Sequence, residues 1–235
     1  MKIEFQEVSV VRSGGVTALD RVSCVIEGGA EASTAVLGAN GAGKSTFLEA
    51  VLGLCPPTSG NILVDGLTAG RHHTGTIRRR IGMVFQNADD QLFSQTVAED
   101  TAFGPHNLGL PPEEVDTRVT AALRELGISH LAGRDVNKLS GGEKRRAALA
   151  GVLAMHPEAL FLDEPTSMLD PRGARELAAL LNSLPNLKVV ATHDLPFARA
   201  TCRQCVILAD GAVRARGTTA ELLARHDLLR ECGLE

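Results

Sequence analysis

The chain has 235 residues, of which 44% are hydrophobic and 22% are charged, and these proportions exclude a disordered or collagen-like protein. This length is enough for one large domain or two small ones with a buried core. The net charge is -4, and the sequence has 7 Phe but no Trp or Tyr. Because the basic excess and the stacking aromatics that are typical of nucleic-acid binding are both absent, we expect no nucleic acid as a partner.

The chain is not expected to cross a membrane by itself. Its longest apolar run, residues 147–155, is too short to span a bilayer, and its start lacks the pattern of a secretory signal. Five cysteines, an odd number, indicate reduced thiols in the cytoplasm. Cys202 and Cys205 form a CxxC pair, for which a redox pair and half a zinc site are alternatives. No second CxxC accompanies it, so two core residues where a helix meets a strand are favoured.

Short β-rich runs alternate with helical patterns along the first part of the chain. Strands are predicted at residues 3–11, 18–26, 33–37, 61–64 and 81–85. A glycine-rich loop follows the third strand and leads into a helix over 44–52. From about residue 96 to 155 the pattern becomes helical. The helix opened by Pro111 and Pro112 has one apolar face, formed by Val115, Val119, Ala122, Leu123 and Leu126.

Two buried strands, 159–162 and 187–191, flank a helix in the last part of the chain. That helix begins at Asp170, the N-cap residue, with Pro171 in its first position. A hairpin over 206–213 and a closing helix complete the chain. Apolar strands alternating with helices predict an α/β fold with a parallel sheet, in which the helical middle is an insertion.

Residues 38–45 match G-x-x-x-x-G-K-[ST], with a strand before them and a helix after them. The glycines let the backbone wrap around a triphosphate and turn its N–H groups inward. Lys44 reaches the outer phosphates, and the Ser45 hydroxyl can ligate Mg²⁺. The alternative, a glycine-rich turn that binds nothing, is disfavoured by the flanking strand and helix.

Polar side chains follow two of the apolar strands. Asp163 and Glu164 end the strand that begins at residue 159, where one carboxylate can hold Mg²⁺ and the next can polarise a water. Two solvated acids are the alternative, which a neighbouring phosphate loop makes less favourable. His193 follows the strand at 187–191, and from the same sheet edge its imidazole can reach a γ-phosphate. A structural histidine remains the alternative there.

The run Leu139-Ser140-Gly141-Gly142-Glu143 precedes a helix. Ser140 and Glu143 have the spacing of a capping box, and the glycines leave the helix N-terminus open to an anion. A plain helix start explains the same residues.

Together, these motifs resemble those of ATP-binding cassette (ABC) ATPases over essentially the whole chain. In this resemblance residues 38–45 are Walker A, Gln86 is the Q-loop glutamine, 139–143 the signature, Asp163 and Glu164 the end of Walker B, 167–170 the D-loop and His193 the switch histidine. Glu143 replaces the commoner Gln. The resemblance implies a P-loop NTPase of the ABC ATPase fold, with a RecA-like parallel-sheet core, an N-terminal antiparallel β-subdomain and an inserted α-helical subdomain. Residues 1–95 and 157–235 would form the core, and 96–156 the helical signature subdomain.

The resemblance also implies the site and its cofactors, ATP and Mg²⁺. Two cassettes, as a homodimer or with a second ABC ATPase, would close head to tail, with Glu164, His193 and Gln86 in catalysis. Mg²⁺ would be held by Ser45, Gln86 and Asp163. ATP would contact Gly38, Asn40, Gly41, Gly43, Lys44, Ser45 and Thr46 of one protomer, and Ser140, Gly141, Gly142 and Glu143 of its partner. The aromatic residue that usually stacks on adenine falls at Val11 or Arg12, so the guanidinium of Arg12 is expected to stack instead.

Residues 84–93, 96–100 and 103–109 resemble, more narrowly, the ATPases of energy-coupling factor (ECF) transporters, which import vitamins or cobalt and nickel ions in prokaryotes. This implies a peripheral subunit on the cytoplasmic face of the cell membrane, beside a substrate-binding S-component. A groove near Gln86 to Phe103 would receive coupling helices of a membrane T-component, whose arginines would meet Asp89, Asp90, Glu99 and Asp100. The short end after the core fold favours a single-ATPase system of the biotin or cobalt/nickel type.

Two other functions compete with import. A non-transport ABC ATPase, for example in iron–sulphur cluster assembly or DNA maintenance, shares the motifs, although no heptads of a long coiled coil interrupt them here. A regulatory cassette without hydrolysis would lack Glu164 or His193, and both are present.

Overall fold

Two β-sheets organise the computed structural model, which describes residues 1–29 and 32–235. The larger sheet has six strands in the order β10-β9-β3-β8-β7-β6 and is parallel except for the β9–β10 hairpin. Its strands are β3 (Ser33–Leu37), β6 (Ile81–Val84), β7 (Ala159–Asp163), β8 (Leu187–Thr192), β9 (Gln204–Ala209) and β10 (Ala212–Thr218). The parallel strands are covered on both faces, which explains why they read as unbroken apolar runs.

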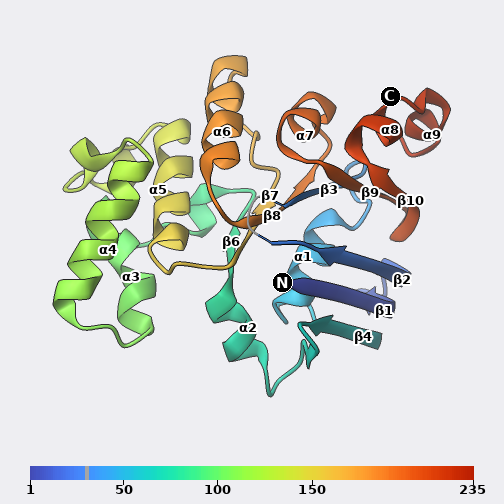
Figure 1. Ribbon diagram of the computed structural model, residues 1–235, viewed down its shortest axis with the longest axis horizontal. Coiled ribbons are helices and arrows are strands. Elements are labelled where there is room, and N and C mark those ends of the chain that lie inside the picture. Colours follow the sequence, from blue (N-terminus) through green and yellow to red (C-terminus); the bar gives the residue numbers. More distant parts are fainter. Residues whose placement is uncertain (30–31) are drawn as a thin grey trace.

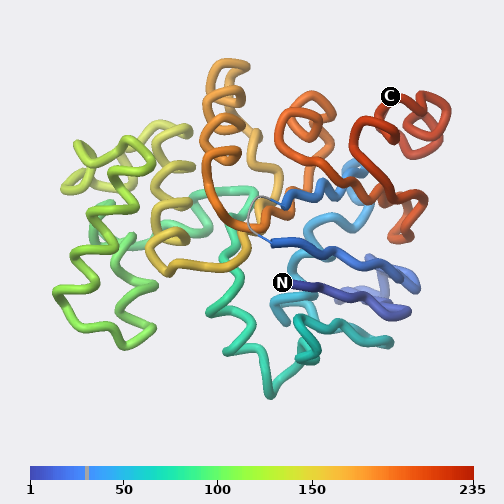
Figure 2. Tube along the Cα trace, viewed as in Figure 1, coloured from blue at the N-terminus to red at the C-terminus, as the bar shows by residue number. Residues whose placement is uncertain are grey.

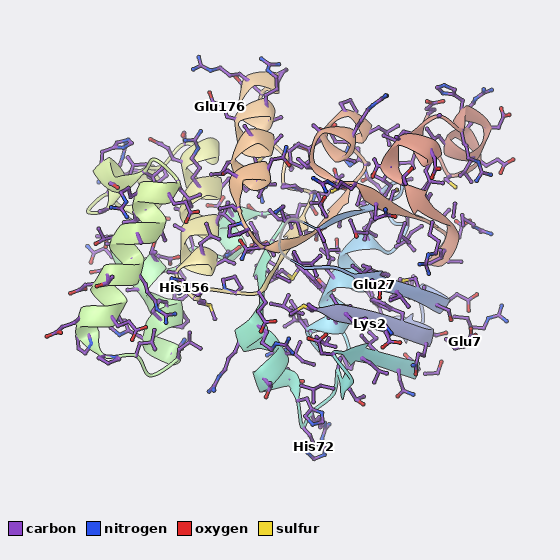
Figure 3. All side chains as sticks on the ribbon, in the orientation of Figure 1. Lys2, Glu7, Glu27, His72, His156 and Glu176 are labelled. Atoms are coloured by element: carbon purple, nitrogen blue, oxygen red, sulfur yellow. The ribbon has the colours of Figure 1, made fainter. Side chains whose placement is uncertain are left out.

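The smaller sheet is antiparallel, with the strand order β2-β1-β4-β5. Its strands are β1 (Lys2–Val11), β2 (Thr17–Glu27), β4 (Ser59–Val64) and β5 (Leu67–Thr68). Ile3 and Phe5 of β1 are buried while Lys2 and Glu7, which are labelled in Figure 3, are exposed, as expected of a sheet with one face on the core. The register shifts between Phe5 and Val8, where Glu7 has a φ of 51°, and this bulge returns Val8 to the buried face.

Helices cover both faces of the large sheet, and three of them stand apart from the antiparallel sheet. In Figure 1, α3, α4 and α5 lie together on the side of the large sheet opposite β1 and β2, and Figure 2 shows the same separation along the chain trace. The helices are α1 (Lys44–Val51), α2 (Thr74–Arg80), α3 (Val97–Asn107), α4 (Pro112–Glu125), α5 (Gly141–Leu153), α6 (Pro171–Ser183), α7 (Leu195–Thr201), α8 (Thr219–Leu223) and α9 (His226–Glu231). None of them is long and apolar enough to span a bilayer, within the residues that the structure describes.

Side chains on the two faces of the large sheet belong to separate apolar cores. Leu160 and Leu162 of β7 pack with the helical side, whereas Phe161 packs with α1 and the antiparallel sheet. This alternation follows the two-residue period of a strand. The strands are thereby held from both faces, and the loops at their carboxyl ends are presented at one fixed edge.

The predicted α/β fold is confirmed, and local differences from the predicted elements have simple causes. The closing helix is two short helices, because the chain leaves the helical conformation between Leu223 and His226. Helix α2 was not predicted, since Ile77 is its one buried residue and an apolar period is therefore missing. The apolar face of α4 is buried as predicted.

Candidate active site

The loop between β3 and α1 has a shape that only glycine permits at its critical positions. Gly41 and Gly43 have φ values of 83° and 100°. A Cβ on Gly43 would lie 2.4 Å from the carbonyl oxygen of Ala18, and one on Gly38 would lie 2.6 Å from that of Leu208. Strand β3 is wholly buried, so it holds this loop at the sheet edge in front of the N-terminus of α1.

Lys44 lies inside this loop rather than in solvent. Its side chain is 6% exposed, and its ammonium donates to the carbonyl oxygens of Gly38 at 2.8 Å and Ala39 at 3.1 Å. The same ammonium lies 3.0 Å from Oε1 of Glu164, the residue that follows β7. A buried pair of this kind depends on its hydrogen bonds, because the low dielectric penalises either charge left alone.

Glu164 is the centre of the buried network. Its Oε2 accepts from the Thr192 hydroxyl at 3.0 Å, and its Oε1 lies 2.9 Å from Nδ1 of His193. Burial raises the pKa of Glu164, but hydrogen bonds from His193 and Lys44 outweigh it, so the pKa lies below its ordinary value. Glu164 is therefore a carboxylate at neutral pH, and its φ of 41° marks a backbone held in an unusual conformation.

The pKa of Asp163 is shifted in the opposite direction, although Asp163 directly precedes Glu164 in the chain. Burial raises its pKa, a hydrogen bond with Ser45 lowers it, and the nearby charge of Glu164 raises it, with a net upward shift. Its Oδ1 is buried and has no hydrogen-bond partner among the described residues. A buried, unsatisfied carboxylate oxygen beside a hydroxyl is the donor set that Mg²⁺ prefers, so these residues fit that ion.

Gln86, Ser45, Lys44 and Glu164 line one cleft of about 480 Å³. Residues 16–18 and Arg12 line its rim. The Arg12 guanidinium donates to Thr46 Oγ1 at 2.9 Å and also pairs with Glu49. Its role in stacking on adenine stays a prediction.

Val16 at the same rim was missed by sequence reasoning. It is 65% exposed, and it gives the cleft an apolar contact surface. The only signal for it was its position just before a strand.

The signature residues lie in a different cleft, of about 680 Å³, between α5 and α6. Ser140, Gly142 and Glu143 line it together with Met168 and Asp170. Ser140 Oγ accepts from the Glu143 N–H at 3.3 Å, and the Glu143 carboxylate accepts from the Ser140 N–H at 2.7 Å, which completes the predicted capping box. Within one chain, therefore, the predicted site residues fall into two separate groups.

The sequence profile of the family described as "ABC transporter" matches residues 19–167. The chain belongs to this family. An ECF transporter ATP-binding protein of Methanospirillum hungatei is 39% identical over 99% of the chain and 85% of that protein. A cobalt import ATP-binding protein of Rhodobacter capsulatus is 46% identical, over 94% and 80%. The solved structure of CbiO1 from Clostridium perfringens, described as part of the CbiONQ transporter complex, has a TM-score of 0.85 and 37% identity, covering 99% and 94%.

These relatives confirm the resemblance to ABC ATPases, and more narrowly to the ECF type. The fold class predicted from the motifs is confirmed as well. The chain is thus an ABC transporter ATPase that binds ATP.

The ABC ATPase carries an apolar groove of about 280 Å³ where the coupling groove was predicted. Phe93 and Phe103 are 65% and 47% exposed, and their rings meet edge to face at 4.6 Å. Leu54, which is 47% exposed, lines the same groove. An exposed aromatic pair of this kind is a feature of protein contact surfaces.

The acids predicted to meet arginines of a partner are largely engaged within the chain. Asp100 is buried and accepts from the N–H groups of Phe93 and Ser94, so the prediction for this residue is wrong. Asp89 pairs with Lys144, and Glu99 belongs to the capping box of α3. Asp90 is exposed. The groove presents apolar rings where acids were expected.

The CxxC pair lies in the core, as favoured from the sequence. Cys202 and Cys205 are buried and unpaired, at the end of α7 and in β9. Burial raises the pKa of Cys202 to about 11 and that of Cys205 to about 12, so both are thiols at neutral pH. Within residues 1–29 and 32–235, no group of three or more His, Cys, Asp or Glu side chains could hold a metal ion.

Proposed function

We propose that this ABC ATPase is the ATP-hydrolysing subunit of an ECF-type importer and works as a head-to-tail pair. The observation that carries the proposal is the separation of the two half-sites. Lys44 and Glu164 line one cleft, while Ser140 and Gly142 line another. A second copy, or a second ABC ATPase, would place its signature helix over the nucleotide that the first copy binds. Met168 lines the same cleft as Ser140 and is 92% exposed, which supports a partner surface at this cleft.

In the proposed reaction, a water attacks the γ-phosphorus of ATP while the bond to the bridging β,γ-oxygen breaks. Glu164, a carboxylate held by Thr192 and His193, accepts the proton that the water loses. Lys44 now shares Oε1 of Glu164 with His193. When Lys44 turns to the phosphates, that oxygen keeps only its contact with His193 and can accept the proton from the water, and the products are ADP and phosphate.

Mg²⁺ would be held by Ser45, Asp163 and Gln86, and would neutralise charge on the β- and γ-phosphates. The buried, unpartnered Oδ1 of Asp163 supports this assignment. Backbone N–H groups of residues 38–46 would surround the phosphates at the N-terminus of α1. Val16 and Arg12 are the proposed contacts for the adenine ring.

The groove with Phe93, Phe103 and Leu54 is the proposed dock for coupling helices of a membrane T-component, in a complex that also contains an S-component. The subunit would then lie peripherally on the cytoplasmic face of a prokaryotic cell membrane. The relative named for cobalt import favours the cobalt/nickel type of system over the biotin type. A non-transport ABC ATPase has no need of such a groove, so this alternative is not favoured.

The half-site proposal is tested with variants that trap the closed pair. Glu164→Gln should form a dimer with ATP in size-exclusion chromatography with light scattering. Adding Ser140→Arg should abolish the dimer while ATP binding persists. The matched control is Thr96→Arg in the Glu164→Gln background, since Thr96 forms the same kind of capping box on α3. A dimer that survives Ser140→Arg, or one that Thr96→Arg abolishes equally, would contradict the proposal.

A further inference from the structure

Arg145 lies one turn into α5 and is buried, with 6% exposure. Its Nη1 donates to the carbonyl oxygen of Phe85 at 2.6 Å, and its Nη2 donates to that of Gln86 at 2.7 Å. The guanidinium fork thus joins α5 to two successive peptide groups of the loop that follows β6. Neither the sequence motifs nor the proposed reaction uses this residue.

Burying a guanidinium costs more free energy than burying an apolar side chain of similar size. Removing a charge from water costs several kcal/mol unless hydrogen bonds compensate, and an apolar side chain of similar size would pack without that cost. Burial lowers the pKa of Arg145, and the nearby charge of Asp163 acts against this. What the guanidinium supplies is a planar fork whose two nitrogens hold two carbonyl oxygens in a fixed geometry, which an apolar side chain cannot do and which a single ammonium nitrogen does without that fixed plane.

Other contacts tie the same loop to the same helix. Gln91 accepts from the Phe85 N–H at 3.1 Å and donates to the carbonyl oxygen of Ala148 in α5, also at 3.1 Å. Lys144 pairs with Asp89 at the surface. The segment 85–91 is therefore bound to α5 at consecutive turns, and the first residue before α5 is Ser140, the signature serine.

The two ends of this connection serve different half-sites. Gln86 lines the cleft that holds Lys44 and Glu164, whereas Ser140 lines the cleft between α5 and α6. We propose that Arg145 is a positioning residue that makes the Gln86 loop and the signature helix move as one body. Nucleotide bound at Gln86 would thereby orient Ser140 for the site of the second copy. This inference rests on the proposed function, because it assumes that both half-sites act in one reaction.

The decisive variant is Arg145→Gln, which keeps polarity but loses the fork and the charge. ATP affinity should stay within about twofold of the wild type, because no nucleotide contact is removed. ATP-driven dimerisation and kcat should each fall roughly tenfold or more, the scale of one lost charge-assisted hydrogen bond. Arg145→Lys should be intermediate, since an ammonium keeps the charge but lacks the planar fork that fixes both carbonyl oxygens in one geometry.

Lys144→Gln is the matched control, because it removes the adjacent cation and an exposed contact with the same loop. It should change kcat by less than twofold, as exposed ion pairs contribute little. Hydrogen exchange supplies a readout that a loss of stability alone would not move. With ATP, segments 85–91 and 139–150 should gain protection together in the wild type, whereas only 85–91 should gain it in Arg145→Gln.

Outcomes for this inference and for the proposed function are distinguishable. If Arg145→Gln dimerises and turns over like the wild type, the positioning role is wrong and the paired half-sites stand. If the wild type neither dimerises nor hydrolyses ATP, the proposed function itself fails. Should Arg145→Gln not fold, Arg145→Lys and wild-type exchange decide: independent protection of the two segments would overturn the inference.

Discussion

The two half-sites of this ABC ATPase are built in opposite ways. Around Lys44 and Glu164, charged groups are buried, with 6% and 5% exposure, and each bonds several others. Around Ser140 and Glu143, the polar groups are more exposed and bond mainly to each other. The first region is the proposed reaction centre, whose groups already bond one another before a substrate arrives, while the second is a helix N-terminus, where the first N–H groups lack intrahelical partners.

This difference predicts how each region tolerates substitution. Removing one member of the buried network strands a charge in a low dielectric, so effects there should be large and involve several residues. Removing a member of the capping box leaves the rest in contact with water. Effects on stability should then be small, and any large effect must come from what a second copy brings.

Glu164→Gln is expected to have the largest effect. Turnover should fall by about 10²–10⁴-fold, the usual contribution of a general base, because the amide cannot accept the proton. ATP affinity should be retained, since Lys44 is then freed from its ion pair. Phosphate release measured beside ATP titration checks both, and near-normal turnover would mean that Glu164 is not the base.

Lys44→Ala should have the next largest effect, on ATP binding rather than on the rate of hydrolysis. We expect ATP affinity to fall roughly 10–100-fold, the scale of one or two charge-assisted hydrogen bonds to phosphate. Titration calorimetry checks this, with Lys138→Ala as a control. Lys138 is an exposed lysine that pairs with Asp135 and does not line this cleft. Unchanged affinity would contradict the phosphate-clamp role of Lys44.

The sequence predicts which residues form the buried half-site better than it predicts the bonds among them. Gly43 is required by the backbone, because its φ is 100° and a Cβ there would meet the carbonyl oxygen of Ala18, and Lys44 was predicted as the next residue of the same motif. The apolar period of β7 likewise placed Asp163 and Glu164 at a sheet edge. The ion pair of Lys44 with Glu164 joins segments far apart in the chain, and no local pattern announces it. The role of Arg145 was not predicted for the same reason, because its partners are backbone carbonyl groups far away in the chain.

The groove shows where sequence reasoning failed. Asp100 reads as a surface acid in a polar helix, yet it accepts from two N–H groups of the preceding turn and is buried there. Side chains of Asp favour such local bonds with the backbone. The exposure of Phe93 and Phe103 depends on tertiary packing, which neither the aromatic content nor a period reveals.

Ser140→Ala and Thr96→Ala sharpen the comparison, because the two residues cap helices in the same way. Both variants should lose about 1 kcal/mol of unfolding free energy, which is typical of a lost N-cap. Only Ser140→Ala should also weaken ATP-driven dimerisation in the Glu164→Gln background, by roughly tenfold if one hydroxyl bonds a phosphate. Urea unfolding and analytical ultracentrifugation measure the two effects, and equal dimerisation would reduce Ser140 to a helix cap.

Asp163→Asn should have a small effect on stability, and one of opposite sign. The pKa of Asp163 is raised by burial and by Glu164, so the folded state disfavours its charge whenever the pH exceeds that pKa. The amide removes this cost, and we expect the melting temperature at pH 7 to rise by about 2–4 °C, the shift that roughly 1 kcal/mol produces in a domain of this size.

The sign of this effect can be followed with pH. As the pH falls through the raised pKa, the wild-type carboxyl becomes neutral in the folded state, so the advantage of Asp163→Asn should shrink and vanish near pH 4. Asp90→Asn, at an exposed acid, should show no such convergence. A variant less stable than the wild type at pH 7 would mean that ionised Asp163 stabilises the fold. Its buried oxygen would then be a structural group. The contrast between a buried site that destabilises the fold and a helix cap whose polar groups bond each other would not hold.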